Sequence, residues 1–364
     1  MISFQPTEEQ ETIRQSIREF AAQAMRESAR PYDEAAAIPD SFLAAAWELG
    51  LTSTQIPEAY GGYGAARSPV TNALVLEELG HGDATLALAA VAPSLFAYAI
   101  LDQGSEEQKK AYLPLFCEAG YHAAALAVAE PVPCFDAYRP RTRAEQKRDA
   151  FVLSGSKCFV PMGDRATHFL VVAAGDGRLE AFVVGREAAG LTVTAPEKNL
   201  GLKALPTARL ELDGVEVPAA ARLGGSNGAD IPRLLDHCRV AQAAILTGSS
   251  RGVLEYCIPY AKERVAFDEP IAQKQSIAFR FSEMHMEIES MRNLVWRAAA
   301  QLESGLDARR MAHFARTYST EKSVWISDNG VQVLGGHGFI REHPVEMWYR
   351  NARTLSVLEG AAAV

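Results

Sequence analysis

The sequence is poor in cysteine, and its apolar residues do not gather in long uninterrupted runs. Five cysteines among 364 residues form no Cys-x-x-Cys pair, which argues against a disulfide framework and favours a reducing compartment. No apolar run approaches the roughly 18 residues needed to cross a bilayer. The acidic start also lacks the Lys/Arg-led apolar leader of a secreted protein. We therefore expect a soluble, cytoplasmic protein that does not bind membranes.

Positive charge is in deficit as well. Lys and Arg number 36 against 45 Asp and Glu, which gives a formal net charge of −9. This balance disfavours a nucleic-acid partner, although a local basic pocket could still hold a phosphate. The eight histidines show no His-Glu-x-x-His or similar spacing, so no metal site is expected.

Three regions of different pattern divide the chain, and the length suits two or three domains. Residues 1–120 follow a helical period, residues 121–228 consist of short β-rich runs, and residues 229–364 return to the helical period. We expect a mixed α and β protein with an N-terminal α-helical domain, a middle β-barrel or sandwich domain and a C-terminal four-helix bundle. In the middle region, Asp213-Gly214 is predicted to be the turn of a strand pair.

Local signals support the helical assignments. Thr7 with Gln10 three residues later is the pattern of a capping box. The segment from Thr85 to Leu101 is almost entirely apolar, which predicts a buried helix. In the last region, apolar residues recur every three or four positions from Met284 to Leu302.

Two motifs and two single residues could carry chemistry. Gly224-Gly225-Ser226-Asn227-Gly228 matches Gly-x-Ser-x-Gly, but no buried strand leads into it, so a hydrolase serine is disfavoured. Gly335-Gly336-His337-Gly338-Phe339 could let a backbone approach a phosphate, or could be a turn between helices. Arg264 could clamp a phosphate or be an ordinary charge at a helix end. Glu359 lies in an apolar setting that suits a general base, with a solvated terminal carboxylate as the alternative.

Taken in order, these and other segments resemble the acyl-CoA dehydrogenase family over nearly the whole chain. The N-terminal segments are Trp47-Glu-Leu-Gly-Leu51, Ile56-Pro-Glu58, Gly61-Gly62, Glu77-Glu-Leu-Gly80 and Gly104-Ser-Glu-Glu-Gln-Lys109. The middle segments are Glu130-Pro131, Leu153-Ser-Gly-Ser-Lys157, Gly201-Leu-Lys203 and Asp213-Gly-Val-Glu-Val-Pro218. The C-terminal segments are Arg264 with Phe267, Gln275, the stretch Gln332 to Phe339, Arg350-Asn-Ala-Arg353 and Glu359-Gly360.

The resemblance implies an FAD-dependent oxidoreductase that removes two hydrogens across Cα and Cβ of an acyl thioester, carried by CoA or an acyl-carrier protein. Glu359 would take the α-proton, and flavin N5 would take the β-hydride. Electrons would pass to an electron-transfer flavoprotein, and the subunits would form a homotetramer or homodimer. The acyl tail would run between helices along residues 86–98.

The resemblance also assigns binding roles. The residues expected to contact FAD are Arg264, Phe267, Gln275, Gln332, Gly335, Gly336 and Gly338, with Ala129, Phe159 and Pro161 on the flavin side. The residues expected near the substrate are Asp236, Arg239 and Gly360. Asp236 and Arg239 could instead form an ion pair on a helix surface.

The flavin side departs from the family pattern. Ala129 stands where a threonine is usual, and Val132-Pro-Cys-Phe-Asp136 replaces a glycine-rich turn. Pro161 has neither hydroxyl nor N–H to offer the flavin, and Asp268 replaces a common glycine. Besides a dehydrogenase, these changes leave open a catalytically impaired partner subunit of a hetero-oligomeric enzyme, and a relative with other flavin chemistry.

Overall fold

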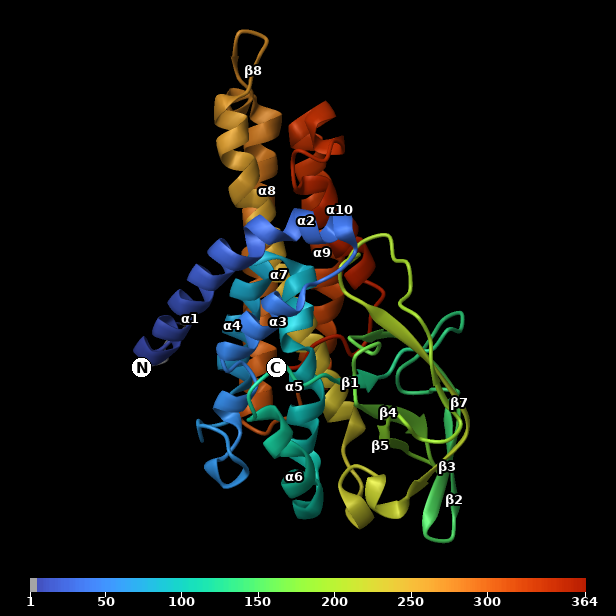
Figure 1. The fold of residues 1–364 in the computed structure, drawn as a ribbon. Helices are drawn as coiled ribbons and strands as arrows, with labels where there is room; N and C mark the ends of the chain where they lie inside the picture. The colour runs from blue at the N-terminus through green and yellow to red at the C-terminus, as the bar shows by residue number, and fades with distance from the viewer. Residues whose placement is uncertain (1–4) are drawn as a thin grey trace.

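A β domain packs against one side of a bundle of helices contributed by both ends of the chain (Figure 1). The computed structural model describes residues 5–364. The last residues of the chain return to the middle of the molecule, beside α5 (Ala84–Gln103) and β1 (Ala124–Ala127). This return brings the C-terminal segment to the border between the helices and the β domain.

The N-terminal helices begin where the sequence predicts. Thr7 and Gln10 form the expected capping box, and Asp83 caps α5 by accepting from the Leu86 N–H at 2.9 Å. A π-helical turn at Ala21–Arg26 joins the first two helices, and short 3-10 turns cover Ser53–Gln55, Glu58–Tyr60 and Leu113–Phe116. The α-helices are α1 (Glu8–Phe20), α2 (Glu27–Ala35), α3 (Asp40–Glu48), α4 (Pro69–Gly82), α5 and α6 (Glu106–Tyr112).

Helix α5 is apolar along almost its whole length. It is long and apolar enough to cross a membrane by length and composition, so the expectation that no such segment exists is wrong. However, 94% of its apolar window is buried inside the protein. Both faces of α5 are covered by other elements, which explains why it lacks a polar stripe.

The β domain is one seven-stranded sheet. Its order is β1-β4-β2-β3-β7-β6, and β5 pairs with β4. Most pairs are antiparallel, but β4 runs parallel to both β1 and β2. The strands after β1 are β2 (Arg143–Lys147), β3 (Ala150–Pro161), β4 (His168–Ala174), β5 (Leu179–Gly185), β6 (Leu191–Val193) and β7 (Thr207–Pro218).

The predicted strand pair around Asp213-Gly214 is wrong. Strand β7 continues through both residues, with Gly214 at φ +65°. The pairing with β3 shifts register there, between Leu153↔Val215 and Gly155↔Leu212. Strand β7 thus has one more residue than β3 at this point, and the glycine has a positive φ. Both features are typical of a β-bulge.

The C-terminal region holds the longest helices. The residues of the predicted stripe from Met284 to Leu302 are all buried. A small hairpin of β8 (Val265–Ala266) and β9 (Glu269–Pro270) joins the first two helices, and a 3-10 turn covers Gly335–Phe339. The helices are α7 (Ile231–Glu263), α8 (Gln275–Glu303), α9 (Arg309–Leu334) and α10 (Val345–Leu355).

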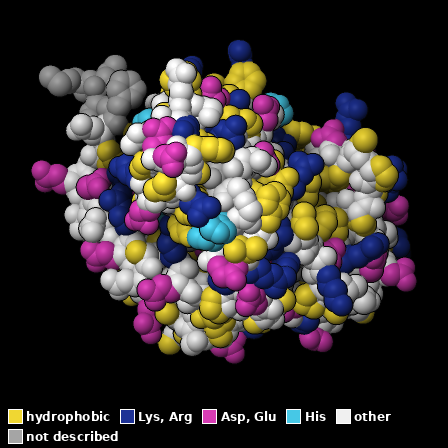
Figure 2. All heavy atoms as spheres, turned by 90° about the horizontal axis from the view of Figure 1, so that it is seen from above, with side chains coloured by type: hydrophobic (Ala, Val, Ile, Leu, Met, Phe, Trp, Pro, Cys, Tyr) yellow, Lys and Arg dark blue, Asp and Glu magenta, His cyan; other side chains and the backbone are white. Residues whose placement is uncertain are grey.

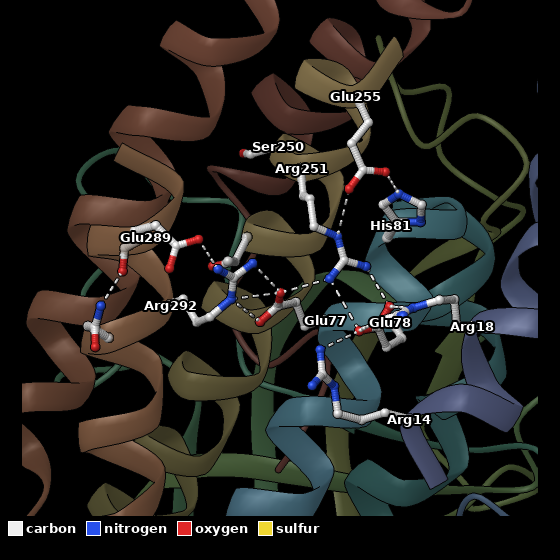
Figure 3. Close-up of polar contacts among 12 residues, drawn as sticks. Arg14, Arg18, Glu77, Glu78, His81, Ser250, Arg251, Glu255, Glu289 and Arg292 are labelled. Atoms are coloured by element: carbon white, nitrogen blue, oxygen red, sulfur yellow. Dashed lines mark hydrogen bonds and ion pairs between the residues drawn. The ribbon is translucent and has the colours of Figure 1, made fainter. Parts of the chain in front are cut away.

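Buried ion pairs fasten the N-terminal helices to the C-terminal ones (Figure 3). Glu77 on α4 accepts from Arg251 of α7 and from Arg292 of α8, the latter at 2.8 Å. The adjacent Glu78 accepts from Arg251 and from Arg14 and Arg18 of α1. The side chain of Glu78 is fully buried, so its charge is compatible with folding only because these guanidinium groups surround it.

Candidate active site between the β domain and the C-terminal helices

Glu359 lies in the interior, four residues after the end of α10. Its exposed fraction is 8%, so the alternative of a solvated terminal carboxylate is wrong. The next residue, Gly360, has φ +72°, and a Cβ there would lie 2.7 Å from Cγ2 of Val128. Glycine is needed at this close approach. It lets the chain dock Glu359 against the end of β1.

Two arginines hold the carboxylate of Glu359. Arg239 Nε on α7 lies 3.0 Å from Oε1, and Arg316 Nη2 on α9 lies 2.8 Å from Oε2. The hydroxyl of Tyr138, from the β domain, accepts from Arg239 Nη1 at 2.6 Å. Charge-assisted hydrogen bonds of this kind make a buried carboxylate tolerable. The result is a buried charged site to which both domains contribute.

Asp236 lies one helical turn before Arg239 and faces the same region. It is 4% exposed, and its Oδ1 has no hydrogen-bond partner among residues 5–364. Burial raises the pKa of Asp236 to about 6, although Arg239 and Arg309 act in the opposite direction. The alternative of a surface ion pair is wrong, because both side chains are buried. The unpartnered oxygen is available to a donor on a bound molecule.

The flavin-side residues lie close together in the β domain, where the Cys158 N–H donates to the Ala129 carbonyl at 2.9 Å. Ala129 is buried just after β1, while Phe159 and Pro161 end β3. Phe159 is half-buried with φ +52°, and its N–H donates to Glu197 Oε2 at 2.9 Å. A cavity of about 510 Å³ near the end of β3 is lined by Met162 and Glu197, whereas Ala129, Phe159 and Pro161 are not among its lining residues. Phe159 thus supplies an aromatic surface, whereas Ala129 and Pro161 supply no side-chain donor.

A buried ion pair supports this part of the sheet. Lys157 Nζ lies 2.8 Å from Glu130 Oε1 and donates to the carbonyl of Val128 at 3.0 Å. Burial lowers the pKa of Lys157 to about 8, although Glu130 acts to raise it. Because Val128 also contacts Gly360, the pair fixes the surface on which the Glu359 segment rests.

The other predicted cofactor residues lie at the far end of the bundle, around β8 (Figure 1). Arg264 ends α7 and Gln275 begins α8. Tyr260 joins this end of α7 to the glycine segment, since its hydroxyl lies 3.3 Å from the Leu334 carbonyl. Within one chain, these residues are therefore separate from Glu359. The members of this second group are Arg264, Phe267, Gln275, Gln332, Gly335, Gly336 and Gly338.

These residues fit a phosphate-bearing cofactor such as FAD. The side chains of Arg264, Gln275 and Gln332 form no hydrogen bond or ion pair with any residue in 5–364. A Cβ at Gly335 or Gly336 would meet nothing within 4 Å, so the backbone there is open to a ligand. Gly338 differs, because a Cβ would lie 2.3 Å from the Val331 carbonyl, which gives it a packing role.

Large apolar side chains are exposed near the same end. Phe267 is 89% exposed and Phe339 is 70% exposed. Seen from above, apolar side chains lie among charges of both signs and not within a field of one sign (Figure 2). Exposed aromatic residues beside free polar groups are typical of surfaces that bind another molecule.

Sequence reasoning missed Tyr138, Arg316 and Gln242. A signal existed for Arg316, because it borders the buried stripe of α9 formed by Ala312, Ala315 and Ser319. A charge at such a position needs a partner. The partner, Glu359, could not be identified from sequence, because no repeating pattern of residues shows that α9 packs against the segment after α10.

The fold and the site define a flavoprotein oxidoreductase made of two helical regions and a β domain. The chain belongs to the acyl-CoA dehydrogenase family, whose members are FAD-dependent oxidoreductases acting on CH–CH groups. The model of the N-terminal domain matches residues 7–119, that of the middle domain 125–215, and that of the C-terminal domain 229–364.

Individual relatives agree with the family models. An acyl-CoA dehydrogenase of Bacillus subtilis is 33% identical over 362 residues, covering 97% of this chain and 95% of that protein. Butyryl-CoA dehydrogenase from Megasphaera elsdenii is 28% identical, with a TM-score of 0.89 and coverage of 100% and 96%. The prolyl acyl carrier protein oxidase AnaB is 26% identical, with a TM-score of 0.88 and coverage of 99% and 96%.

Proposed function

We propose that the protein catalyses α,β-dehydrogenation of an acyl thioester, with Glu359 as the base that takes the α-proton. One observation carries the proposal: Glu359 is a buried carboxylate held at the edge of the β domain by Arg239 and Arg316. A buried and fixed carboxylate avoids the reorganisation that water would impose on a base.

The chain's own residues can prepare the proton transfer. An ionised carboxylate has about four lone-pair sites. Arg239 Nε donates to one of them on Oε1, and Arg316 forms an ion pair with Oε2. Lone pairs therefore remain for the substrate carbon acid. The nearby Oδ1 of Asp236 could accept an N–H from the thioester's carrier arm. Bound FAD supplies the acceptor for the β-hydride.

The substrate carrier can be CoA or an acyl-carrier protein. Relatives of both descriptions share the fold, namely butyryl-CoA dehydrogenase and the carrier-protein oxidase AnaB. The acyl tail would lie along α5, where the side chains from Leu86 to Tyr98 are buried. The residues after Gly360 join the same hydrophobic clusters as α5 and so limit the space for that tail.

The location of the second residue group supports an oligomer. Strand β8, which directly follows Arg264, lies at the far end of the bundle from the C-terminus (Figure 1), so Arg264 and the glycine segment would contact the FAD of a neighbouring subunit in a dimer or tetramer. Electrons would then pass to an electron-transfer flavoprotein, as in the family.

An impaired partner subunit is the second candidate. It is favoured by the flavin side, where Ala129 and Pro161 provide no side-chain donor. Such a subunit would keep Arg264 and the glycine segment for the FAD of a different chain. Its own site would remain without the cofactor.

The visible spectrum of the purified protein tests both candidates. We expect one FAD per active site and anaerobic bleaching by at least one member of a panel of acyl-CoA and acyl-carrier-protein thioesters. Glu359→Gln should keep the FAD and lose the bleaching, because an amide cannot accept the α-proton. Glu216→Gln, on the exposed edge of β7, is the matched control and should bleach like the wild type.

Two results would contradict the dehydrogenase proposal. Bleaching that is unchanged in Glu359→Gln removes Glu359 from the role of base. A colourless protein that gains FAD only when mixed with a second dehydrogenase-like chain supports the impaired partner subunit instead.

A further inference from the structure

The segment that carries Glu359 has no regular structure of its own. Helix α10 ends at Leu355, and the residues from Ser356 to Glu359 form a turn followed by an irregular stretch. A base on such a segment is not fixed by a helix or a strand, so neighbouring side chains must hold it.

Arg316 makes contacts at two points of this segment. Its Nη2 lies 2.8 Å from Glu359 Oε2 and donates to the carbonyl of Leu358 at 2.9 Å. One guanidinium group therefore fixes both the carboxylate and the peptide just before it. Both contacts come from the one nitrogen Nη2, so the other donors of the planar group can hold its orientation.

Gln242 extends the same arrangement to the end of α10. Its Oε1 accepts from Arg316 Nε at 3.2 Å, and its Nε2 donates to the carbonyl of Leu355. Gln242 is 1% exposed and lies on α7, one turn after Arg239. The segment is thus held at Leu355, at Leu358 and at the Glu359 carboxylate.

The electrostatic environment of Arg316 points to the same partner. Burial lowers the pKa of Arg316, whereas the Glu359 carboxylate acts to raise it. Among residues 5–364, Glu359 is the acidic residue with which Arg316 forms an ion pair. The groups facing Glu359 from α7 are Arg239 and Cys238, while Asp236 and Tyr138 face Arg239.

We infer that Arg316 is a positioning residue that orients Glu359 for proton abstraction, acting on both its carboxylate and its backbone. This inference rests on the proposed function, in which Glu359 is the base. It adds that α9 contributes a side chain on which the rate of α-proton removal depends.

The test separates proton removal from the oxidation that follows it. We would use an acyl-CoA whose β-carbon bears no hydrogen, such as 3,3-dimethylbutyryl-CoA, and follow exchange of its α-protons in D₂O by mass spectrometry. Binding of the same thioester, FAD content and the melting temperature would be measured in parallel. Variants are Arg316→Gln and Arg316→Lys, with Arg292→Gln as the control, since Arg292 is a similarly buried, ion-paired arginine on α8.

Arg316→Gln should slow exchange per FAD-loaded molecule by about tenfold to a hundredfold, as expected for a misplaced catalytic group. Thioester affinity should change by less than about threefold, because the loss concerns the transition state. Arg316→Lys should recover part of the rate, since it restores the charge but not the fork. Arg292→Gln should lower the melting temperature and leave the exchange rate unchanged.

A second measurement does not depend on activity. Modification of Glu359 by a water-soluble carbodiimide, read by peptide mass spectrometry, should be faster in Arg316→Gln than in the wild type and unchanged in Arg292→Gln. Unchanged modification, or exchange that falls only as far as the melting temperature predicts, would overturn the positioning role. A wild type that shows no exchange would refute the proposed function, while the modification rates would still decide whether Arg316 holds Glu359.

Discussion

Asp83 and Glu359 are both buried carboxylates, but their partners differ. Glu359 is neutralised by two guanidinium groups, whereas Asp83 caps α5 with Oδ1 and leaves Oδ2 without a partner among the described residues. Burial raises the pKa of Asp83 to about 6. The folded state therefore holds a proton there between about pH 4 and 6 that the unfolded chain has lost. Ionised Asp83 lowers stability above that window.

Replacing Asp83 by asparagine should stabilise the protein at neutral pH. An amide keeps the capping acceptor for Leu86 and removes the buried charge, so we expect the free energy of unfolding at pH 7.5 to rise by about 1–3 kcal/mol. Urea unfolding at pH 7.5 and pH 4 measures it. The gain should vanish at pH 4, where Asp83 is protonated. Asp83→Ala, which loses the cap, should be less stable than wild type at both pH values. If Asp83→Asn has a lower free energy of unfolding than wild type at pH 7.5, burial of a charge at Asp83 is not the cause of the instability.

At the scale of secondary-structure elements, the β8–β9 hairpin turns through two consecutive non-glycine residues with positive φ. Its two turn residues, Phe267 and Asp268, have φ of +56° and +67°. Asp tolerates this region better than most residues, but glycine adopts it without steric cost. The turn also adds the carboxylate of Asp268 to the end of the bundle that carries Arg264 and is proposed to face the FAD pyrophosphate.

Asp268→Gly should therefore improve both the turn and cofactor retention. We expect a gain of up to about 1 kcal/mol in unfolding free energy from the relieved backbone, and tighter FAD binding from the loss of repulsion with the phosphates. Titration of apoprotein with FAD measures the affinity. Asp268→Asn keeps the side chain but not the charge, so it should bind FAD more tightly without the full gain in stability. Weaker FAD binding by both variants would show that the carboxylate does not face the cofactor.

The elements were predictable from sequence where their signals are local. The capping box at Thr7, the buried stripe of α8 and the apolar α5 follow from residue spacing alone. The bulge at Asp213-Gly214 was not predictable, because an Asp-Gly dipeptide also suits a hairpin turn. Only the pairing with β3 distinguishes a bulge from a turn. The contact of Arg316 with Glu359 was likewise beyond reach, since it depends on how α9 and the end of α10 pack.

For the whole molecule, the Glu77–Glu78 cluster is a buried polar connection between the two helical regions (Figure 3). Burial alone would raise the pKa of Glu78, but hydrogen bonds from Arg251 and Arg18 outweigh it and lower the pKa to about 2. A depressed pKa in the folded state means that this stability is present above about pH 4.5. It is lost as the pH falls toward 2.

Glu78→Gln should destabilise the protein by about 3–5 kcal/mol at pH 7, because it leaves buried guanidinium groups without their anion. The difference from wild type should shrink as the pH is lowered from 5 to 3, where the wild type itself begins to lose the interaction. Thermal unfolding followed by circular dichroism over this range measures it. Exposed Glu216→Gln serves as the control, and a pH-independent difference would show that packing and not charge is responsible.

The close approach of Gly360 to Val128 has a consequence for biogenesis. These two residues come from distant parts of the polypeptide, and Gly360 follows all the helices and strands described above in chain order. The segment after α10 can dock against β1 only when the sheet is already in place. Under the proposed function, removal of the α-proton would therefore depend on the docked C-terminal segment, and activity would report that this last step of folding has occurred.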